Sequence, residues 1–155
     1  MTSPRAGHGI WRRTLAAATA AWLLTLGAGS ARASVVEVAV TGVRDTRGDV
    51  RVDICTRDTF LRATCPYEGM APATVGATVV KVAGVPPGLY AAQAFHDVTG
   101  EGHVHQNVLG IPREGIGFSN DAPLRVKGPR FQDAAFSVGG PFERITLKLK
   151  HLFGR

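Results

Sequence analysis

The first 33 residues contain no aspartate or glutamate, and this gap accounts for most of the chain's charge. The 155 residues include 18 Lys+Arg and 12 Asp+Glu, and the formal charge of +6 by itself suggests a polyanionic partner. Four arginines lie in the acid-free segment, so residues 34–155 keep 14 basic against 12 acidic side chains, a net charge of +2. Nucleic-acid binding needs clustered cations that neutralise phosphates. We therefore expect no nucleic-acid partner, and we interpret the basic stretch Arg125–Arg130 as an ordinary surface loop.

The chain also lacks an apolar run of the roughly 20 residues that an α-helix needs to cross a bilayer. The uncharged, mostly apolar stretch 14–29 has 16 residues, and Ala31 and Ala33 supply the small residues of a cleavage site. We expect residues 1–33 to be a signal peptide that is removed, which leaves a periplasmic or secreted protein without a permanent membrane anchor. Arg12 and Arg13 partly resemble a twin-arginine signal, so ordinary secretion and twin-arginine export both stay open.

After residue 33 no segment sustains a helical period, and apolar residues recur with period two instead, which is typical of half-buried strands. Residues 44–49 have the composition of a turn, so we expect the strands before and after them to pair as an antiparallel hairpin. About seven short strands predict one all-β domain over residues 34–155, an antiparallel β-sandwich. The clearest strand candidates are residues 36–40, 50–54, 74–83, 89–95, 133–138 and 142–149.

Cysteine is scarce, with Cys55 and Cys65 alone in the chain. In an exported protein two such cysteines most simply form one disulfide, which would staple the loop between them. The alternative is a redox or nucleophilic cysteine, which requires a free thiol in a site that lowers its pKa.

Several stretches of the chain resemble a known family. Residues 82–92 (VAGVPPGLYAA), the triplet 95–97 (FHD) and residues 107–120 (NVLGIPREGIGFSN) resemble the bacterial domain-of-unknown-function family 2141, and the match continues through Gly128 to residues 131–136. The resemblance covers essentially the whole mature chain and implies an exported, sandwich-like domain with no assigned biochemical role. The turn before Leu89 is more distantly similar to transthyretin-like sandwiches, so the implied fold is immunoglobulin-like or transthyretin-like.

Members of this family commonly carry an acidic loop after the His-Asp pair that is similar to a short calcium loop. Here residues 97–105 supply about two carboxylates, fewer than the six to eight oxygens that calcium requires, so we expect no tight calcium site. Imidazoles suit zinc, copper or nickel. The loop therefore offers a candidate divalent-metal site formed by His96, Asp97, Glu101, His103 and His105. The alternative is that His96 fixes the loop by hydrogen bonding while the other histidines are solvated, in which case the protein has no cofactor.

Catalytic signatures are absent from residues 34–155: there is no G-x-S-x-G, H-E-x-x-H or Walker motif. Ser119 could form a triad with His96 and an aspartate, but no spacing favours it. We therefore predict no enzyme activity and expect a binding or structural module of the cell envelope, working through the loop region 96–120, with an unknown envelope protein or glycan as partner. The alternative function is a metal-binding protein that uses the 96–105 loop.

Overall fold

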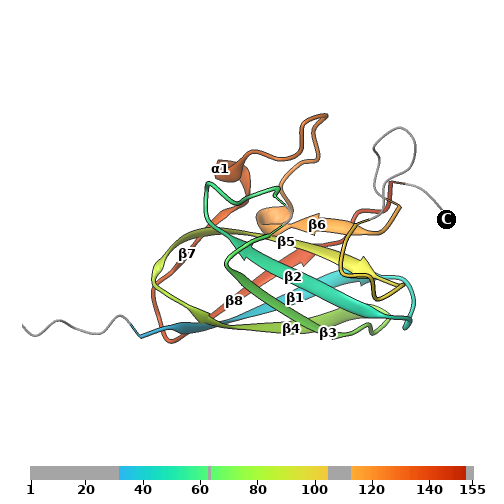
Figure 1. The fold of residues 1–155 in the computed structure, drawn as a ribbon, viewed down its shortest axis with the longest axis horizontal. Helices are drawn as coiled ribbons and strands as arrows, with labels where there is room; N and C mark the ends of the chain where they lie inside the picture. The colour runs from blue at the N-terminus through green and yellow to red at the C-terminus, as the bar shows by residue number, and fades with distance from the viewer. Residues whose placement is uncertain (1–31, 63, 105–112, 153–155) are drawn as a thin grey trace, which may run out of the picture.

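The computed structural model describes residues 32–62, 64–104 and 113–152, so the predicted signal peptide lies almost wholly outside the described residues. Within these ranges no helix is long and apolar enough to cross a membrane. The same ranges form eight strands, one 3-10 turn (Ser119–Asp121) and one short helix, α1 (Phe131–Ala134) (Figure 1). The strands are β1 Ser34–Val43, β2 Asp49–Cys55, β3 Tyr67–Pro72, β4 Gly76–Val85, β5 Gly88–Asp97, β6 Ile116–Phe118, β7 Ala135–Val138 and β8 Phe142–Lys148.

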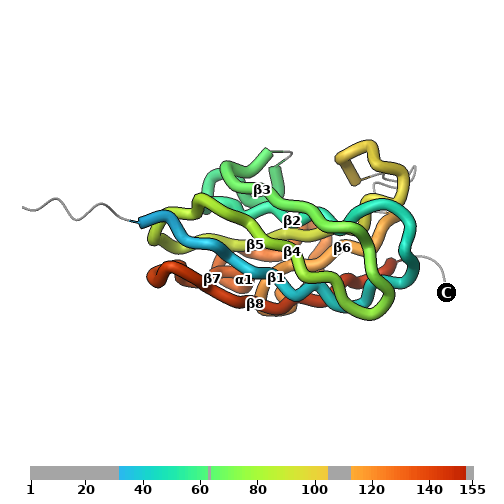
Figure 2. Tube along the Cα trace, turned by 90° about the horizontal axis from the view of Figure 1, so that it is seen from below, coloured from blue at the N-terminus to red at the C-terminus, as the bar shows by residue number. Residues whose placement is uncertain are grey.

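The strands form two sheets that pack face to face, so the prediction of an all-β sandwich is confirmed. One sheet has the order β4-β1-β8, and Figure 2 shows these three strands side by side. The other has the order β3-β2-β5-β6, and β7 pairs with the first half of β5 on the same side as β6. Strand pairing is antiparallel except between β1 and β8, which run parallel, so the expectation of a purely antiparallel sandwich is wrong at this one pair.

The predicted hairpin of the first two strands is also wrong, because β1 and β2 belong to different sheets. Val36, Val38 and Val40 of β1 and Val50 and Val52 of β2 are all fully buried. Two strands that face each other across a sandwich bury alternate residues in the same way as two strands paired in a hairpin. The period-two pattern therefore cannot distinguish the two arrangements.

The main hydrophobic core fills the space between the sheets and is rich in valine. A second cluster lies on the outer face of the five-stranded sheet, where Phe118 and Phe131 pack around Phe60 with ring centroids 5.8 Å apart in both pairs. This cluster anchors residues 119–134 and the loop after β2 on top of the sheet. Part of that face is thus covered, and the part beside it remains open.

Both edges of the sandwich are closed by a glycine that lets two backbones approach. A Cβ on Gly69 of β3 would lie 2.7 Å from the Lys81 carbonyl oxygen of β4, and a Cβ on Gly117 of β6 would lie 2.6 Å from the Lys148 carbonyl oxygen of β8. Next to Gly117, the backbones of Ile116 and Lys150 exchange two hydrogen bonds of 3.1 and 2.7 Å. The close approach holds β6 against β8.

We expect Gly117→Ala to lower the free energy of unfolding by about 2 kcal/mol, because the added methyl group must push two backbones apart. Denaturant unfolding at equilibrium measures the loss. Gly139→Ala is the matched control, since a Cβ there meets nothing within 4 Å. A midpoint for Gly117→Ala equal to that of Gly139→Ala would show that the edge is not tightly packed.

Candidate binding groove

The open part of the five-stranded sheet presents two cross-strand rows of side chains on its outer face. One row runs from Met70 on β3 through Arg51 and Phe95 to Ile116 on β6. The second row is Glu68, Asp53, Gln93 and Phe118. Successive residues of a strand point to opposite faces, so burial of intervening residues such as Val52 and Ala94 in the core directs these side chains outward. Both rows thus carry charged groups on β2 and apolar groups on β6.

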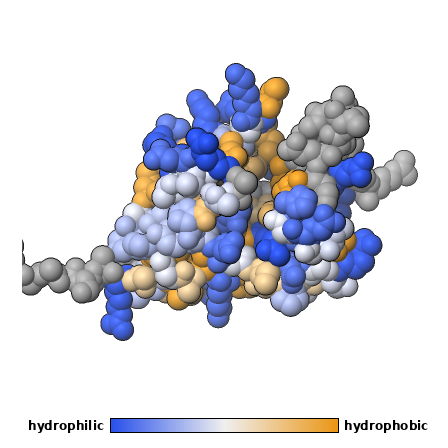
Figure 3. Space-filling view, viewed as in Figure 1, coloured by the Kyte–Doolittle hydropathy of each residue, from blue (hydrophilic) through white to orange (hydrophobic). Residues whose placement is uncertain are grey.

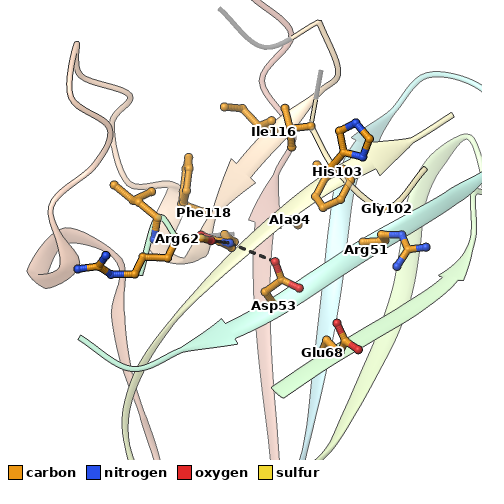
Figure 4. Close-up of a pocket in the computed structure, with 13 residues that line it drawn as sticks. Arg51, Asp53, Arg62, Glu68, Ala94, Gly102, His103, Ile116 and Phe118 are labelled. Atoms are coloured by element: carbon orange, nitrogen blue, oxygen red, sulfur yellow. Dashed lines mark hydrogen bonds between the residues drawn. The ribbon is translucent and has the colours of Figure 1, made fainter. Parts of the chain in front are cut away.

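Apart from Met70, which lies beside it, these two rows form the floor of a groove of about 440 Å³. Leu61 and Arg62 of the loop after β2 form the first wall, at one end of the groove. Gly102, His103 and Val104 of the loop after β5 form the second wall, at the other end. Figure 3 shows hydrophobic atoms between raised, mostly hydrophilic regions on this face. In Figure 4 the carboxylates of Asp53 and Glu68 lie on one side of the groove and Phe118 and Ile116 on the opposite side.

The first wall is held by the disulfide Cys55–Cys65, which confirms the predicted pairing and uses both cysteines of the chain. Within this loop the Thr56 backbone N–H donates to the Thr59 hydroxyl at 3.0 Å. Gln93 connects the wall to the floor, since its side-chain oxygen accepts from the Leu61 N–H at 3.3 Å and its Nε2 donates to Asp53 Oδ2 at 3.1 Å. The wall is therefore attached covalently at its base and by hydrogen bonds to the sheet.

The second wall is organised by Asp97, whose side chain is 1% exposed. Its Oδ1 accepts from the N–H groups of Gly100 at 2.8 Å and Glu101 at 3.1 Å, and its Oδ2 accepts from the Gly102 N–H at 2.8 Å. Arg51 Nε also donates to Oδ2 at 2.9 Å. Burial favours the neutral acid, but these four donors outweigh it and hold the pKa of Asp97 below its ordinary value.

The residues of the predicted metal site do not share one cluster here. His96 is buried with its Nε2 2.8 Å from the Arg47 carbonyl oxygen, and Asp97 is engaged as described. Glu101 and His103 meet at the surface, with Nε2 and Oε2 3.6 Å apart, whereas His105 lies outside the described residues. In the parts of the chain that the structure covers, no group of three or more His, Cys, Asp and Glu is placed to hold a metal ion. The metal site stays a prediction, to be tested by elemental analysis of the native protein.

Ser119, considered above as a triad member, is fully buried. Its hydroxyl accepts from the Ala92 N–H at 2.9 Å and donates to the Ala134 carbonyl oxygen. The side chain therefore joins the 3-10 turn to β5 and α1.

Sequence reasoning missed most of the groove floor, although four residues that line the groove, Gly102, His103, Ile116 and Phe118, lie in the 96–120 region expected to be the working surface. Arg51 and Asp53 look like the ordinary outward residues of an alternating strand, and Glu68 lies in β3, which shows no buried position. The sequence gives no local signal for the floor, but the structure shows that two like charges on it face each other. Asp53 lies directly opposite Glu68 in adjacent strands, an arrangement that destabilises a sheet. Burial raises the pKa of Asp53, the Gln93 hydrogen bond lowers it, and Glu68 raises it further, with a net upward shift.

We expect Asp53→Asn to raise the free energy of unfolding by about 0.5 kcal/mol at pH 7, because it removes repulsion between directly opposed charges. The folded state raises the pKa of Asp53, so ionisation of this group costs stability as pH rises through that pKa. The gain should accordingly vanish below about pH 4, where the acid is protonated in both states. Thermal unfolding of the Asp53→Asn and unmodified proteins at pH 7 and pH 3 measures this gain in stability. Asp58→Asn, at an exposed position of the first wall, is the control, and a less stable Asp53→Asn protein at pH 7 would contradict the interpretation.

Comparison with known proteins gives one match. A family model described as "Uncharacterized protein conserved in bacteria (DUF2141)" matches residues 38–146. No curated protein and no solved structure matches the chain. The matched residues extend from β1 into β8 and include both rows of the groove floor.

Proposed function

The chain belongs to the DUF2141 family of uncharacterized bacterial proteins, and from this premise we propose that it is an exported, non-catalytic binding module of the cell envelope. Its ligand binds in the groove on the outer face of the five-stranded sheet. The observation that carries the proposal is that both walls of the groove are fixed independently of any ligand, one by the disulfide and one by the buried carboxylate of Asp97. A site that is already ordered loses little conformational freedom on binding.

Two features support the exported location. The sequence pattern of residues 1–33 is that of a signal peptide. Cys55 and Cys65 form a disulfide, and such bonds persist in the periplasm and outside the cell but are rare in the cytosol. Fractionation of cells that express the full chain tests this part: the protein should appear in the periplasm or the medium with a mass that corresponds to a start at Ser34. A protein that stays in the cytosol with Met1 intact would refute it.

Site-specific photocrosslinking in living cells tests the binding role. A photoreactive residue at Met70, which is 60% exposed and lies beside the groove, opposite Arg51 in the adjacent strand, should yield a discrete adduct. The same residue at Val79, which is 50% exposed on the outer face of the other sheet, is the matched control. An adduct formed at Met70 and not at Val79 supports the proposal. Absence of an adduct at Met70, or the same adduct at both positions, contradicts it.

A further inference from the structure

We propose that the ligand of the groove is an uncharged oligosaccharide, an inference that rests on the proposed binding function and specifies its ligand class. The first observation is that charges of both signs line the groove. Asp53 and Glu68 contribute two carboxylates, and Arg51 and Arg62 contribute two guanidinium groups. A polyanion would face the carboxylates and a polycation would face the guanidinium groups, so the groove favours a ligand without net charge.

Part of each cation's hydrogen-bonding capacity is already used within the protein. Arg51 Nε donates to Asp97, and Arg62 Nε donates to the Asp58 carbonyl oxygen at 2.7 Å. These bonds fix the two guanidinium groups at opposite ends of the floor. Between them lie the carboxylates of Asp53 and Glu68 (Figure 4). The floor therefore presents donors and acceptors in close alternation.

A hydroxyl group matches such a floor because it donates one hydrogen bond and accepts up to two. Neighbouring hydroxyls of a sugar ring can donate to a carboxylate and accept from a guanidinium group at the same time. Hydrogen bonds to ionised groups are about twice as strong as those between neutral groups. Asp53 adds a reason of its own: its ionised form is costly in the free protein, since it is partly buried opposite Glu68, and donated hydroxyls would stabilise it.

The apolar side of the groove matches the C–H faces of a sugar ring. Phe95 and Phe118 are each 8% exposed and, with Ile116, face the groove across from the carboxylates. A pyranose ring carries hydroxyls around its rim and C–H groups on its faces, so one ring can bond to the polar side while a face packs on the apolar side. Pockets for small ligands commonly combine an apolar lining with a few oriented polar groups in this way.

The sheet topology argues against an extended peptide as the ligand. Peptides that add to a sheet need a strand edge with unpaired backbone groups. The groove floor is a sheet face, and its central strands β2 and β5 are each paired on both sides. Recognition at the floor must therefore come from side chains, which is how hydroxylated ligands are bound.

Calorimetric titration of the mature protein tests the inference with three neutral tetrasaccharides: maltotetraose, cellotetraose and tetra-N-acetylchitotetraose. At least one should bind at millimolar concentration, and Asp53→Asn should weaken that binding about tenfold because a charge-assisted bond is lost. Loss of fold cannot explain such a result, because this substitution is expected to stabilise the protein. Glu37→Gln, a carboxylate-to-amide change on β1 of the opposite sheet, should bind as the unmodified protein does.

Three outcomes would overturn the inference: no binding of any neutral tetrasaccharide, binding that Asp53→Asn leaves unchanged, or tighter binding of a cationic glucosamine tetramer or an anionic galacturonate tetramer. The crosslinking experiment shows whether such a result rejects the glycan ligand alone or the binding role as well. An adduct at Met70 that contains protein and no carbohydrate would keep the binding module and reject the glycan. No adduct at all would reject both.

Discussion

Replacing Asp97 with alanine should lower the free energy of unfolding by about 3–5 kcal/mol, the range observed when one partner of a buried ion pair is removed. The substitution leaves Arg51, whose side chain is 29% exposed, without its carboxylate. It also leaves the N–H groups of Gly100, Glu101 and Gly102 without their acceptor. Equilibrium denaturation of the mature protein measures the loss.

Asp45→Ala is the matched control for this prediction. Asp45 also accepts from a backbone N–H and from an arginine, both belonging to Arg47, at 2.8 and 2.9 Å. Its side chain is 39% exposed, and exposed pairs of this kind contribute about 1 kcal/mol or less. Equal losses for the two substitutions would show that burial of Asp97 does not matter and that the second wall is not organised around it.

The effect of Asp97 should also depend on pH with a definite sign. Folding lowers the pKa of this carboxyl, so its stabilising contribution is present above the unfolded value of about 3.9 and is lost as pH falls through the folded value. The difference between the unmodified protein and Asp97→Ala should therefore shrink in acid. Asp53 has the opposite sign, so the two carboxylates of the groove region can be distinguished by unfolding curves at pH 3 and pH 7.

The strands could be predicted from the sequence because most of them bury alternate residues in a single core. The sheet that each strand joins could not be predicted from the sequence, as the positions of β1 and β2 show. β3 escaped prediction because all its positions are at least partly exposed, and it contains Gly69, Met70 and Pro72 where valine or isoleucine would mark a strand. The expected strand from Asp133 begins only at Ala135, because Phe131 starts a turn of helix that buries its ring in the outer cluster.

The walls of the groove were more predictable than its floor. Cysteine pairing and the loop after Asp97 depend on residues close together in the chain, where spacing carries information. The floor combines Glu68, Asp53, Gln93 and Phe118 from four strands, and their alignment depends on strand register. Register follows from the core packing of all strands together, which a single period-two pattern does not contain. Asp97 shows the same limit: a loop rich in acid and glycine suggests a metal, and the sequence does not reveal that this carboxylate accepts from the N–H groups of its own loop.

Removal of the disulfide by Cys55→Ala/Cys65→Ala should lower the free energy of unfolding by about 3 kcal/mol, since the bridge closes a loop between residues ten positions apart and restricts the unfolded chain. Dithiothreitol should reduce the stability of the unmodified protein by a similar amount and leave the double variant unchanged. Denaturant midpoints with and without reductant measure both effects, and a stable double variant would contradict the assignment.

The same double variant separates the role of the wall from the role of the floor. Leu61 and Arg62 would remain tied to the sheet by the hydrogen bonds of Gln93 and by the packing of Phe60 against Phe118 and Phe131, without the covalent link. Ligand binding should then weaken because the wall must be ordered at the moment of binding, at about 0.5–1.5 kcal/mol for each immobilised side chain. The charge-assisted bonds to Asp53 would persist. Combining the double variant with Asp53→Asn should therefore give additive losses of affinity, and a strongly non-additive result would mean that the disulfide acts by positioning the floor itself.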